Sequence, residues 1–335
     1  MGENTREGSV VSIRFRLAIF GITCLGFIGL CAPISSAQVA RTELHAIPTL
    51  TLSDHQFLIG DKNGTPVTIA GALRVPHLGT DRLPAVILVH GSGGIGGNVD
   101  RWSQELNSFG VATFVTDSFT ARGIQSTVAN QALLGRLNMI LDSYRALGVL
   151  AAHPRIDPKK IVLMGFSRGG QATLYASLKR FEQMYGPEGA TFAAYVPFYA
   201  PCFTTYIGDE DVSDKPIRLF HGTVDNYVPV APCRAYVDRL RKAGKDVMLT
   251  EYPDANHAFD NPLLKVGPAP QAQTTRRCTM TEEPAGTIIN AVTKQPFTME
   301  DPCVERGPNL GYNAAATAAA TQAVKEFLQV TLKLN

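Results

Sequence analysis

The chain has little net charge and no concentration of charge of one sign. It carries 31 lysines and arginines against 29 aspartates and glutamates, a formal net charge of +2 over 335 residues. No basic stripe with interleaved aromatic residues occurs, which argues against a nucleic-acid surface. The glycine-rich segment 90–94 lacks the Gly-Lys-Ser/Thr ending of a phosphate-binding loop. These absences remove nucleic acid from the expected partners and leave a small molecule.

Long apolar runs are absent except near the N-terminus. Three arginines precede an uncharged apolar run over residues 17–30, and Ser35 and Ala37 stand at the −3 and −1 positions of a cleavage site before Gln38. This layout predicts a secretory signal peptide over residues 1–37 and a mature protein that is periplasmic or secreted. A retained anchor is the alternative, but the run is short for a membrane span and Pro33 follows it. We expect no stable membrane span once the signal is removed.

Cysteine is scarce, and no Cys-x-x-Cys pair occurs. Two of the six cysteines fall within residues 1–37, which leaves Cys202, Cys233, Cys278 and Cys303. Their spacings, and the lack of a histidine cluster nearby, argue against a zinc site, so we expect no metal and no cofactor. An even number of cysteines in an exported chain predicts two disulfides, and four free thiols are the alternative.

Short apolar runs alternate with amphipathic stretches along residues 38–335, which indicates strands alternating with helices. Strands are expected at 85–89, 111–115, 160–164, 192–199, 217–220 and 247–252. Helices are expected at 99–109, 137–152, 171–181, 232–243 and 313–334. The alternation predicts a single α/β domain whose mostly parallel central sheet is covered by helices on both faces. Segments 47–52 and 68–73 could add an antiparallel hairpin at one edge.

Residues 261–312 depart from this alternation. They are rich in proline, threonine and glycine, show no clear period, and contain Cys278 and Cys303. We expect an irregular excursion before the last helix, held by a disulfide because it lacks a core of its own.

The segment Gly165-Phe-Ser167-Arg-Gly169 is a G-x-S-x-G sequence that lies directly between a predicted strand and a predicted helix. This is the setting of a nucleophile elbow. The turn is so tight that side chains at the flanking glycine positions would collide with the strand and the helix. The motif predicts Ser167 as a nucleophile, and an ordinary helix N-cap serine is the alternative.

A serine hydroxyl needs an adjacent base, and in this kind of fold the acid and then the histidine follow the serine along the chain. His257, in a loop just after a strand, is predicted as the base, whereas His221 ends a strand and is expected to be structural. Asp225 follows the same strand as His221 and is predicted to orient the imidazole. Asp254 is the alternative acid, but it is close to His257 in sequence and suits a turn.

An oxyanion hole needs two backbone N–H groups aimed at the developing charge. One is expected from Arg168, the residue after the nucleophile, and the other from the turn 90–94, with Ser92 favoured and Gly93 as the alternative. The side chains of Arg122 and Arg168 also fall near the catalytic edge and could bind a substrate carboxylate. A salt bridge or a solvated surface position is the favoured interpretation of both.

The positions of the cysteines predict their pairing. Cys202 follows the strand at 192–199, and Cys233 opens the helix after the Asp225 loop. Both places lie at the carboxyl edge of a parallel sheet, on strands expected to be neighbours. We therefore predict a Cys202–Cys233 bridge that clamps the loop of Asp225, and a Cys278–Cys303 bridge within the excursion.

With these residues assembled, the chain resembles the dienelactone-hydrolase-like group of α/β hydrolases. The segments that carry the resemblance are HGSGG (90–94), DSFTARG (117–123), HPRIDPKKIVLMGFSRGG (153–170), FYAPC (198–202), HGTVDNYVPVAPC (221–233) and NHAFD (256–260). The resemblance implies the same triad and a hydrolase acting on a small ester or lactone. The founding dienelactone hydrolases use a cysteine nucleophile where this chain has Ser167, which favours a general carboxylester hydrolase. An exported peptidase of the same fold and a non-catalytic binding protein that keeps the fold are the alternatives.

Overall fold

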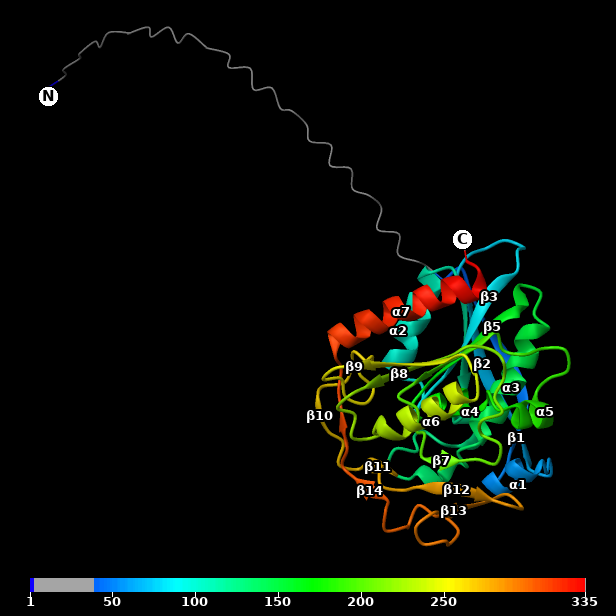
Figure 1. Ribbon diagram of the computed structural model, residues 1–335. Helices are drawn as coiled ribbons and strands as arrows, with labels where there is room; N and C mark the ends of the chain where they lie inside the picture. Colours follow the sequence, from blue (N-terminus) through cyan, green and yellow to red (C-terminus); the bar gives the residue numbers. More distant parts are fainter. Residues whose placement is uncertain (3–38, 335) are drawn as a thin grey trace. The chain divides into compact units, whose positions relative to one another are not determined.

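The fold is built on one eight-stranded sheet. The computed structural model describes residues 1–2 and 39–334, so the predicted signal peptide lies outside the described residues apart from Met1 and Gly2. The strands run in the order β1-β2-β4-β3-β5-β6-β8-β9 (Figure 1). Their bounds are β1 (Arg41–Thr51), β2 (Thr65–Val75), β3 (Leu83–Val89), β4 (Ala112–Asp117), β5 (Ile156–Phe166), β6 (Ala194–Phe198), β8 (Ile217–Gly222) and β9 (Val247–Tyr252).

Most of the sheet is parallel. Every neighbouring pair from β4 to β9 is parallel, whereas β2 is antiparallel both to β1 and to β4. The mostly parallel sheet and the antiparallel edge hairpin predicted from the sequence are therefore confirmed. Because the parallel strands end at the same edge, the loops after β3, β5, β6, β8 and β9 gather there.

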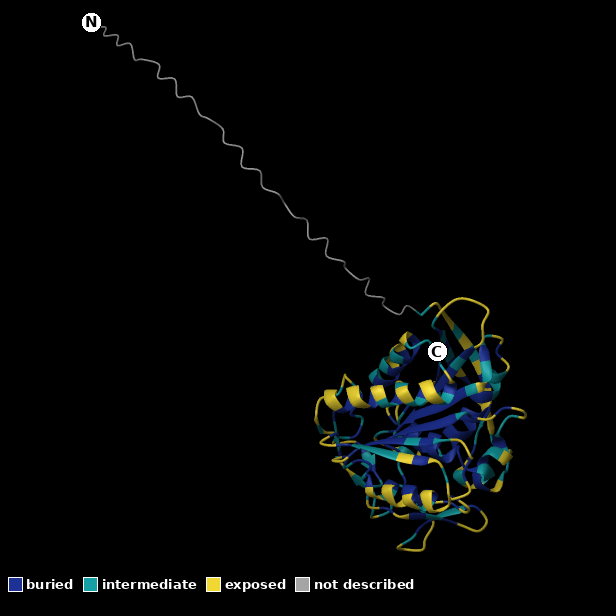
Figure 2. Ribbon diagram, turned by 45° about the horizontal axis from the view of Figure 1, so that its top comes forward, coloured by how far each residue is buried: buried dark blue, intermediate teal, exposed yellow. Residues whose placement is uncertain are grey.

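Helices cover both faces of the sheet. Their bounds are α1 (Asp54–Ile59), α2 (Gly97–Ser108), α3 (Asn138–Ala151), α4 (Arg168–Tyr175), α5 (Lys179–Tyr185), α6 (Ala231–Lys242) and α7 (Ala314–Leu332), with 3-10 turns η1 (Thr120–Arg122) and η2 (Gln131–Leu133). Side chains of α3, α5 and α6 join one apolar cluster against one face, and those of α2 and α7 join a second cluster against the other. Figure 2 shows the buried strands between helices whose outer surfaces are exposed.

The single helix predicted at 171–181 is wrong, because the chain forms two helices there. Helix α4 ends at Tyr175 and α5 begins at Lys179. Between them the backbone bonds to a distant segment: the Ser213 N–H donates to the Ser177 carbonyl at 2.7 Å, and the Lys179 N–H donates to the Asp211 carbonyl at 3.0 Å. These tertiary hydrogen bonds replace the helical ones.

Residues 261–312 are more ordered than the sequence suggests. They contain the short strands β10 (Gly267–Pro268), β11 (Gln273–Thr274), β12 (Met280–Glu283), β13 (Thr287–Asn290), β14 (Glu305–Arg306) and β15 (Asn309–Leu310). Strand β12 also pairs in parallel with β7 (Thr204–Thr205), which follows β6. Side chains of this segment share a third apolar cluster with Phe203, Tyr227 and Val228. The segment was expected to lack a core, but it packs onto the loops that follow β6 and β8.

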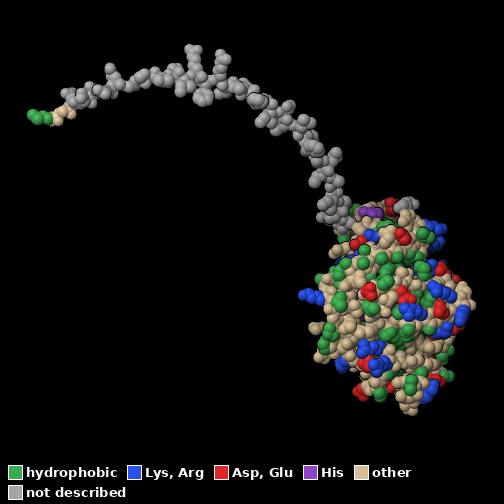
Figure 3. Space-filling view, turned by 60° about the vertical axis from the view of Figure 1, so that its left-hand side comes forward, with side chains coloured by type: hydrophobic (Ala, Val, Ile, Leu, Met, Phe, Trp, Pro, Cys, Tyr) green, Lys and Arg blue, Asp and Glu red, His purple; other side chains and the backbone are tan. Residues whose placement is uncertain are grey.

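The surface carries both signs of charge. On the face shown in Figure 3, basic and acidic side chains are interspersed among apolar and neutral ones, in keeping with the small net charge. No helix within residues 39–334 combines the length and the apolar character that a membrane crossing requires.

Candidate active site

Ser167 occupies the sharp turn between β5 and α4, with backbone angles φ 55° and ψ −112°. A positive φ is costly for a residue with a side chain, so the surroundings must enforce it. The flanking glycines explain how the turn closes. A Cβ on Gly165 would lie 2.2 Å from the Gly169 carbonyl oxygen, and a Cβ on Gly169 would lie 2.2 Å from the Val89 carbonyl oxygen. The strand–turn–helix context expected for the motif is present.

Three predicted residues meet at the carboxyl edge of the sheet. Ser167 Oγ lies 2.8 Å from His257 Nε2, and His257 Nδ1 lies 2.7 Å from Asp225 Oδ2. Asp225 follows β8 and His257 follows β9, so strands far apart in sequence deliver them to the serine. With its proton on Nδ1, the imidazole donates to the carboxylate and can accept the proton of the serine hydroxyl.

The Asp225 carboxylate is buried and fully bonded. Its Oδ1 accepts the N–H groups of Tyr227 and Val228 at 2.9 and 2.8 Å, while Oδ2 faces His257. Burial alone raises the pKa of Asp225, but the charge of His257 and the hydrogen bonds of His221 and His257 outweigh it and lower the pKa to about 2. The group is therefore a carboxylate at neutral pH.

Neither alternative residue makes a hydrogen bond to Ser167 among the described residues. His221 Nε2 donates to the Val228 carbonyl at 2.7 Å and lies 3.4 Å from Asp225 Oδ2, behind the acid rather than beside the serine. Asp254 sits in an exposed turn with φ 56°, and among the described residues its carboxylate makes no hydrogen bond to His257. This placement favours His257 and Asp225 over them.

The glycine-rich turn after β3 packs directly against the nucleophile. A Cβ on Gly91 would lie 3.4 Å from the Ser167 Cβ, so a side chain there would crowd the serine. The backbone N–H groups of Ser92, Gly93 and Arg168 donate no hydrogen bond to any of the described residues. All three donors are available to a substrate oxygen, and the choice between Ser92 and Gly93 stays open.

His90 holds this turn, a role that the sequence analysis missed. Its Nδ1–H donates to the Gly91 carbonyl at 2.8 Å, and its Nε2 accepts the Ser118 N–H at 3.2 Å. The ring is buried, and burial lowers the pKa of His90, which keeps it neutral and preserves both roles. The DSFTARG segment thus supports the turn from behind.

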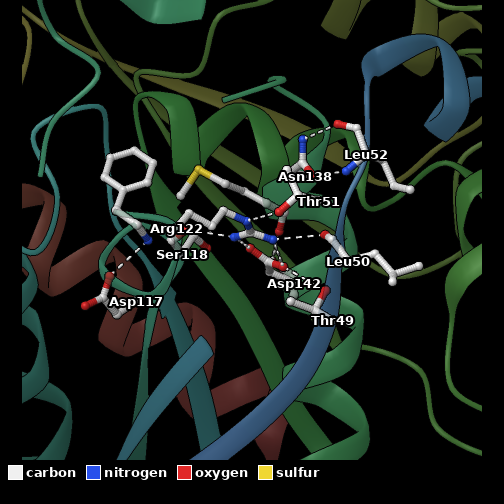
Figure 4. A network of polar contacts seen from close by, with 12 residues as sticks. Thr49, Leu50, Thr51, Leu52, Asp117, Ser118, Arg122, Asn138 and Asp142 are labelled. Atoms are coloured by element: carbon white, nitrogen blue, oxygen red, sulfur yellow. Dashed lines mark hydrogen bonds and ion pairs between the residues drawn. The ribbon is translucent and has the colours of Figure 1, made fainter. Parts of the chain in front are cut away.

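Arg122, within that segment, points away from the substrate space. Its guanidinium pairs with the Asp142 carboxylate at 2.8 Å, and both side chains are almost completely buried. It also donates to Thr51 Oγ1 and to the Ser118 carbonyl (Figure 4). Arg122 therefore ties the end of β1 and the loop after β4 to α3, in line with the salt bridge favoured from the sequence.

Arg168 differs from the expectation, because its side chain is neither in a salt bridge nor solvated. Its guanidinium is buried and donates to neutral oxygens: Thr127 Oγ1 at 3.2 Å, Gln131 Oε1 at 2.8 Å and the Leu134 carbonyl. No carboxylate pairs with it within the described residues, and burial lowers the pKa of Arg168 to about 10. The side chain fixes the loop 127–134 against α4.

Two cavities open beside Ser167. The first, about 60 Å³, has a mixed lining that includes the polar side chains of Gln131, Arg136, Arg168 and Thr274, and we call it the polar cavity. The second, about 310 Å³, contains Ser167 and His257 and is lined largely by apolar side chains, and we call it the apolar cavity. The apolar and aromatic residues of this second cavity are Val128, Phe166, Tyr199, Tyr227, Ala258, Leu264 and Leu310.

The excursion supplies walls to both cavities. Gln273, Thr274 and Met299 line the polar cavity, while Leu264 and Leu310 line the apolar one. The segment 261–312 has neither a motif nor a period, so its sequence does not predict which of its residues line the site. Its two cysteines were the only signal that it holds a fixed position.

A buried aromatic network supports the histidine. The His257 ring lies between the rings of Tyr199 and Tyr227, with centroids 4.7 Å apart in each case. The Tyr199 hydroxyl donates to Asp260 Oδ1 at 2.7 Å, and Trp102 Nε1 donates to Asp260 Oδ2 at 2.7 Å. Burial raises the pKa of Asp260, which has neutral donors as its hydrogen-bond partners. The network fixes the loop that carries His257.

Both predicted cysteine pairs are disulfides in the structure. Cys202, after β6, is bonded to Cys233 in α6, and Cys278 is bonded to Cys303 within the excursion. The first bridge joins the loop after β6 to α6, and Asp225 lies between these two elements in the sequence. The second lies in the segment that walls the cavities.

The comparison with known proteins identifies the family. The sequence profile of the dienelactone hydrolase family matches residues 69–332, most of the chain. The chain belongs to the dienelactone hydrolase family. The match begins within β2 and includes β3 to β9, the elbow and the loops of Asp225 and His257, so the resemblance drawn from the sequence is confirmed.

Individual relatives match the chain over shorter stretches than the family profile does. A probable carboxylesterase of Arabidopsis thaliana is 31% identical over 110 residues, 33% of this chain and 40% of that protein. A probable carboxylic ester hydrolase of Mycobacterium tuberculosis is 29% identical over 163 residues, 36% of this chain and 38% of that protein. The match thus spans about two fifths of the length of these relatives.

Solved structures share the fold over most of the chain. A dienelactone hydrolase-like promiscuous phosphotriesterase from metagenomic libraries has a TM-score of 0.55 and 17% identity, covering 87% of this chain and 98% of that one. Esterase 2 of Thermogutta terrifontis, phosphoramylated by tabun, has a TM-score of 0.53 and 16% identity, covering 88% and 95%. Because the sequence identity is so low, this likeness concerns the fold alone, which is the α/β-hydrolase fold.

Proposed function

We propose that the protein is a serine hydrolase that cleaves carboxylic esters or lactones through an acyl-enzyme on Ser167. The observation that carries this proposal is the continuous line of hydrogen bonds from Ser167 Oγ through His257 to the buried Asp225 carboxylate. Membership of the dienelactone hydrolase family supports it, and so do the ester-hydrolase names of the curated relatives.

In acylation, Ser167 Oγ attacks the ester carbonyl carbon while His257 Nε2 takes the hydroxyl proton. The carbonyl π electrons move onto oxygen, and the N–H groups of Arg168 and of Ser92 or Gly93 stabilise that oxyanion. His257 then returns the proton to the departing alkoxide, which leaves the acyl group on the serine. In deacylation a water molecule repeats the attack with the same base, and the acid is released.

Asp225 acts on His257 and not on the substrate. Because its pKa is lowered to about 2, the carboxylate keeps its charge at any pH where an imidazole can act as a base. It holds the Nδ1–H tautomer and stabilises the imidazolium formed during attack.

The two cavities support a substrate with unlike groups on either side of the scissile bond. The apolar cavity suits a hydrocarbon group, which gains free energy by leaving water. The polar cavity contains Arg136 and Arg168 and no carboxylate among its lining residues, which suits a group with oxygen acceptors or negative charge.

Export is part of this proposal. Residues 1–37 have the layout of a cleavable signal, and the two disulfides suit an oxidising compartment. N-terminal sequencing of the protein from a periplasmic or culture fraction should begin at Gln38. Protein that keeps residues 1–37 and sediments with membranes would instead indicate a retained anchor.

An activity screen tests the reaction class. The mature protein should hydrolyse p-nitrophenyl esters of graded chain length or small lactones, and the Ser167→Ala variant should not. Cleavage of peptides with no ester activity would favour the peptidase alternative. Saturable binding of an ester that remains intact would favour the binding-protein alternative.

A further inference from the structure

Three potential metal ligands converge at the edge of the sheet opposite the active site. Glu43 and His45 are two residues apart on β1, so their side chains project from the same face of the strand. His153 lies in the loop between α3 and β5 and reaches the same place from 110 residues away. The ligand atoms, Glu43 Oε2, His45 Nε2 and His153 Nε2, all lie within 4.8 Å of one another.

Two of the three distances between the ligand atoms match those of a tetrahedral ion site. Glu43 Oε2 lies 3.4 Å from His45 Nε2 and 3.2 Å from His153 Nε2. Ligands about 2.0–2.1 Å from a zinc ion at tetrahedral angles are about 3.3 Å apart. The two distances to the carboxylate oxygen are therefore near the separation that a bound ion would impose, and the two histidine nitrogens lie within 4.8 Å of each other.

One ligand atom is left without a partner. His45 Nε2 is buried and makes no hydrogen bond among the described residues, although it faces the carboxylate at 3.4 Å. Buried ring nitrogens usually have a hydrogen-bond partner, so this one requires an explanation. The other carboxylate oxygen, Glu43 Oε1, accepts from Arg41 Nε at 2.8 Å, which orients Oε2 toward the two histidines.

We propose that Glu43, His45 and His153 form a binding site for a divalent transition-metal ion of the zinc type. Two imidazole nitrogens and one carboxylate oxygen are ligands that such an ion prefers, and water would complete the tetrahedron. The side chains of Glu43 and His45 are 22% exposed, which leaves a path for the ion and for that water. The carboxyl end of α3, which precedes His153, adds the negative end of a helix dipole.

Binding requires one local change. In the structure His153 Nδ1 accepts the Arg155 N–H at 3.2 Å, which places the ring proton on Nε2, where it is donated to Glu43. An ion at Nε2 needs the lone pair of that atom. The proton must therefore exchange to Nδ1 through water, and the Arg155 hydrogen bond opens.

The position of the site indicates its role. It joins the start of the first strand to the loop that leads from α3 into β5, at the amino ends of the parallel strands. An ion there would tie the edge strand to the sheet and raise the stability of the fold, since it binds the native state alone. The absence of a metal was predicted from the spacing of the cysteines, whereas the pair Glu43 and His45 meets its third ligand, His153, only in the fold.

The test uses zinc and cobalt salts with the purified mature protein, freed of metal and carrying no histidine tag. Titration calorimetry should show one Zn²⁺ bound per chain, and Co²⁺ should give the visible absorption of a tetrahedral site. His45→Gln combined with His153→Gln should lower the Zn²⁺ affinity by more than about tenfold. His77→Gln, which changes a histidine of the β2–β3 loop, is the matched control and should bind as the wild type does.

Thermal unfolding separates loss of the site from loss of the fold. Zn²⁺ should raise the Tm of the wild type and of Ser167→Ala, but not that of the double histidine variant, whose metal-free Tm serves as its own reference. Because Ser167→Ala is included, the result does not depend on the proposed hydrolase activity. No saturable Zn²⁺ binding by the wild type, or equal binding by the double variant, would overturn the proposal.

Discussion

The strained turn at Ser167 depends on the two glycines beside it. A methyl group on Gly165 would lie 2.2 Å from a backbone oxygen. Neither the strand nor the helix can move far enough to relieve that contact. We expect Gly165→Ala to destabilise the fold by roughly 2 kcal/mol or more and to abolish activity. Thermal denaturation measures the first effect.

Gly148→Ala is the control for that substitution. Gly148 lies inside α3, and its new Cβ would meet the nearest atom, on Pro187, at an ordinary 3.5 Å. Alanine is the better helix former, so this variant should be as stable as the wild type or more stable, by up to about 1 kcal/mol. Equal losses in both variants would contradict the steric account of the elbow.

The acid also carries a stability effect that depends on pH. The pKa of Asp225 in the fold, about 2, is lower than its ordinary value of 3.8. The carboxylate therefore stabilises the fold above pH 3.8, and this contribution is lost as the pH falls through 3.8 toward 2. Relative to Asp225→Asn, the wild type should lose about 1 kcal/mol of unfolding free energy between about pH 6 and about pH 3. Urea denaturation at both pH values measures this, and parallel losses in the two proteins would contradict it.

Arg136 is the residue through which the polar cavity should select its substrate. Its guanidinium lies 5.5 Å from the Phe297 ring, and no carboxylate pairs with it within the described residues. Arg136→Gln should raise the KM of an ester with a carboxylate in its alcohol or acyl group by about tenfold, while a neutral ester of the same length keeps its KM. A rise for both esters would indicate a structural role instead.

At the scale of elements, the two disulfides should act differently. Cys202–Cys233 joins the loop after β6 to α6, on either side of Asp225, whereas Cys278–Cys303 closes a loop in the excursion. Each closure stabilises the fold by about 3 kcal/mol. Changing Cys202 and Cys233 together to serine should lower kcat more than the same change of Cys278 and Cys303. Equal effects on kcat would refute the clamp on the Asp225 loop.

Local patterns predicted the elements and the candidate catalytic residues, and tertiary contacts decided the rest. The alternation of strands and helices and the G-x-S-x-G turn lie within short windows, and chain order then selected Asp225 and His257. The break between α4 and α5 depends on Asp211 and Ser213, more than thirty residues further on, which no window could include.

The residues that line the two cavities could not be predicted from the sequence either. Gln131, Arg136 and Thr274 carry no motif and reach Ser167 only because separate loops fold over it. In the sequence His90 is the first residue of a glycine-rich turn, and its contact with Ser118 depends on the pairing of β3 with β4. Residues that support a site from a distance become visible only in the assembled fold.

For the whole molecule, the central claim is that one serine carries the reaction. A fluorophosphonate probe should form one covalent adduct with the mature protein, and peptide mapping by mass spectrometry should place it on Ser167. Ser167→Ala should lose the adduct together with about three orders of magnitude in hydrolytic rate, the remainder coming from the oxyanion donors and binding. An adduct at another residue, or labelling and ester hydrolysis that survive Ser167→Ala, would contradict the account.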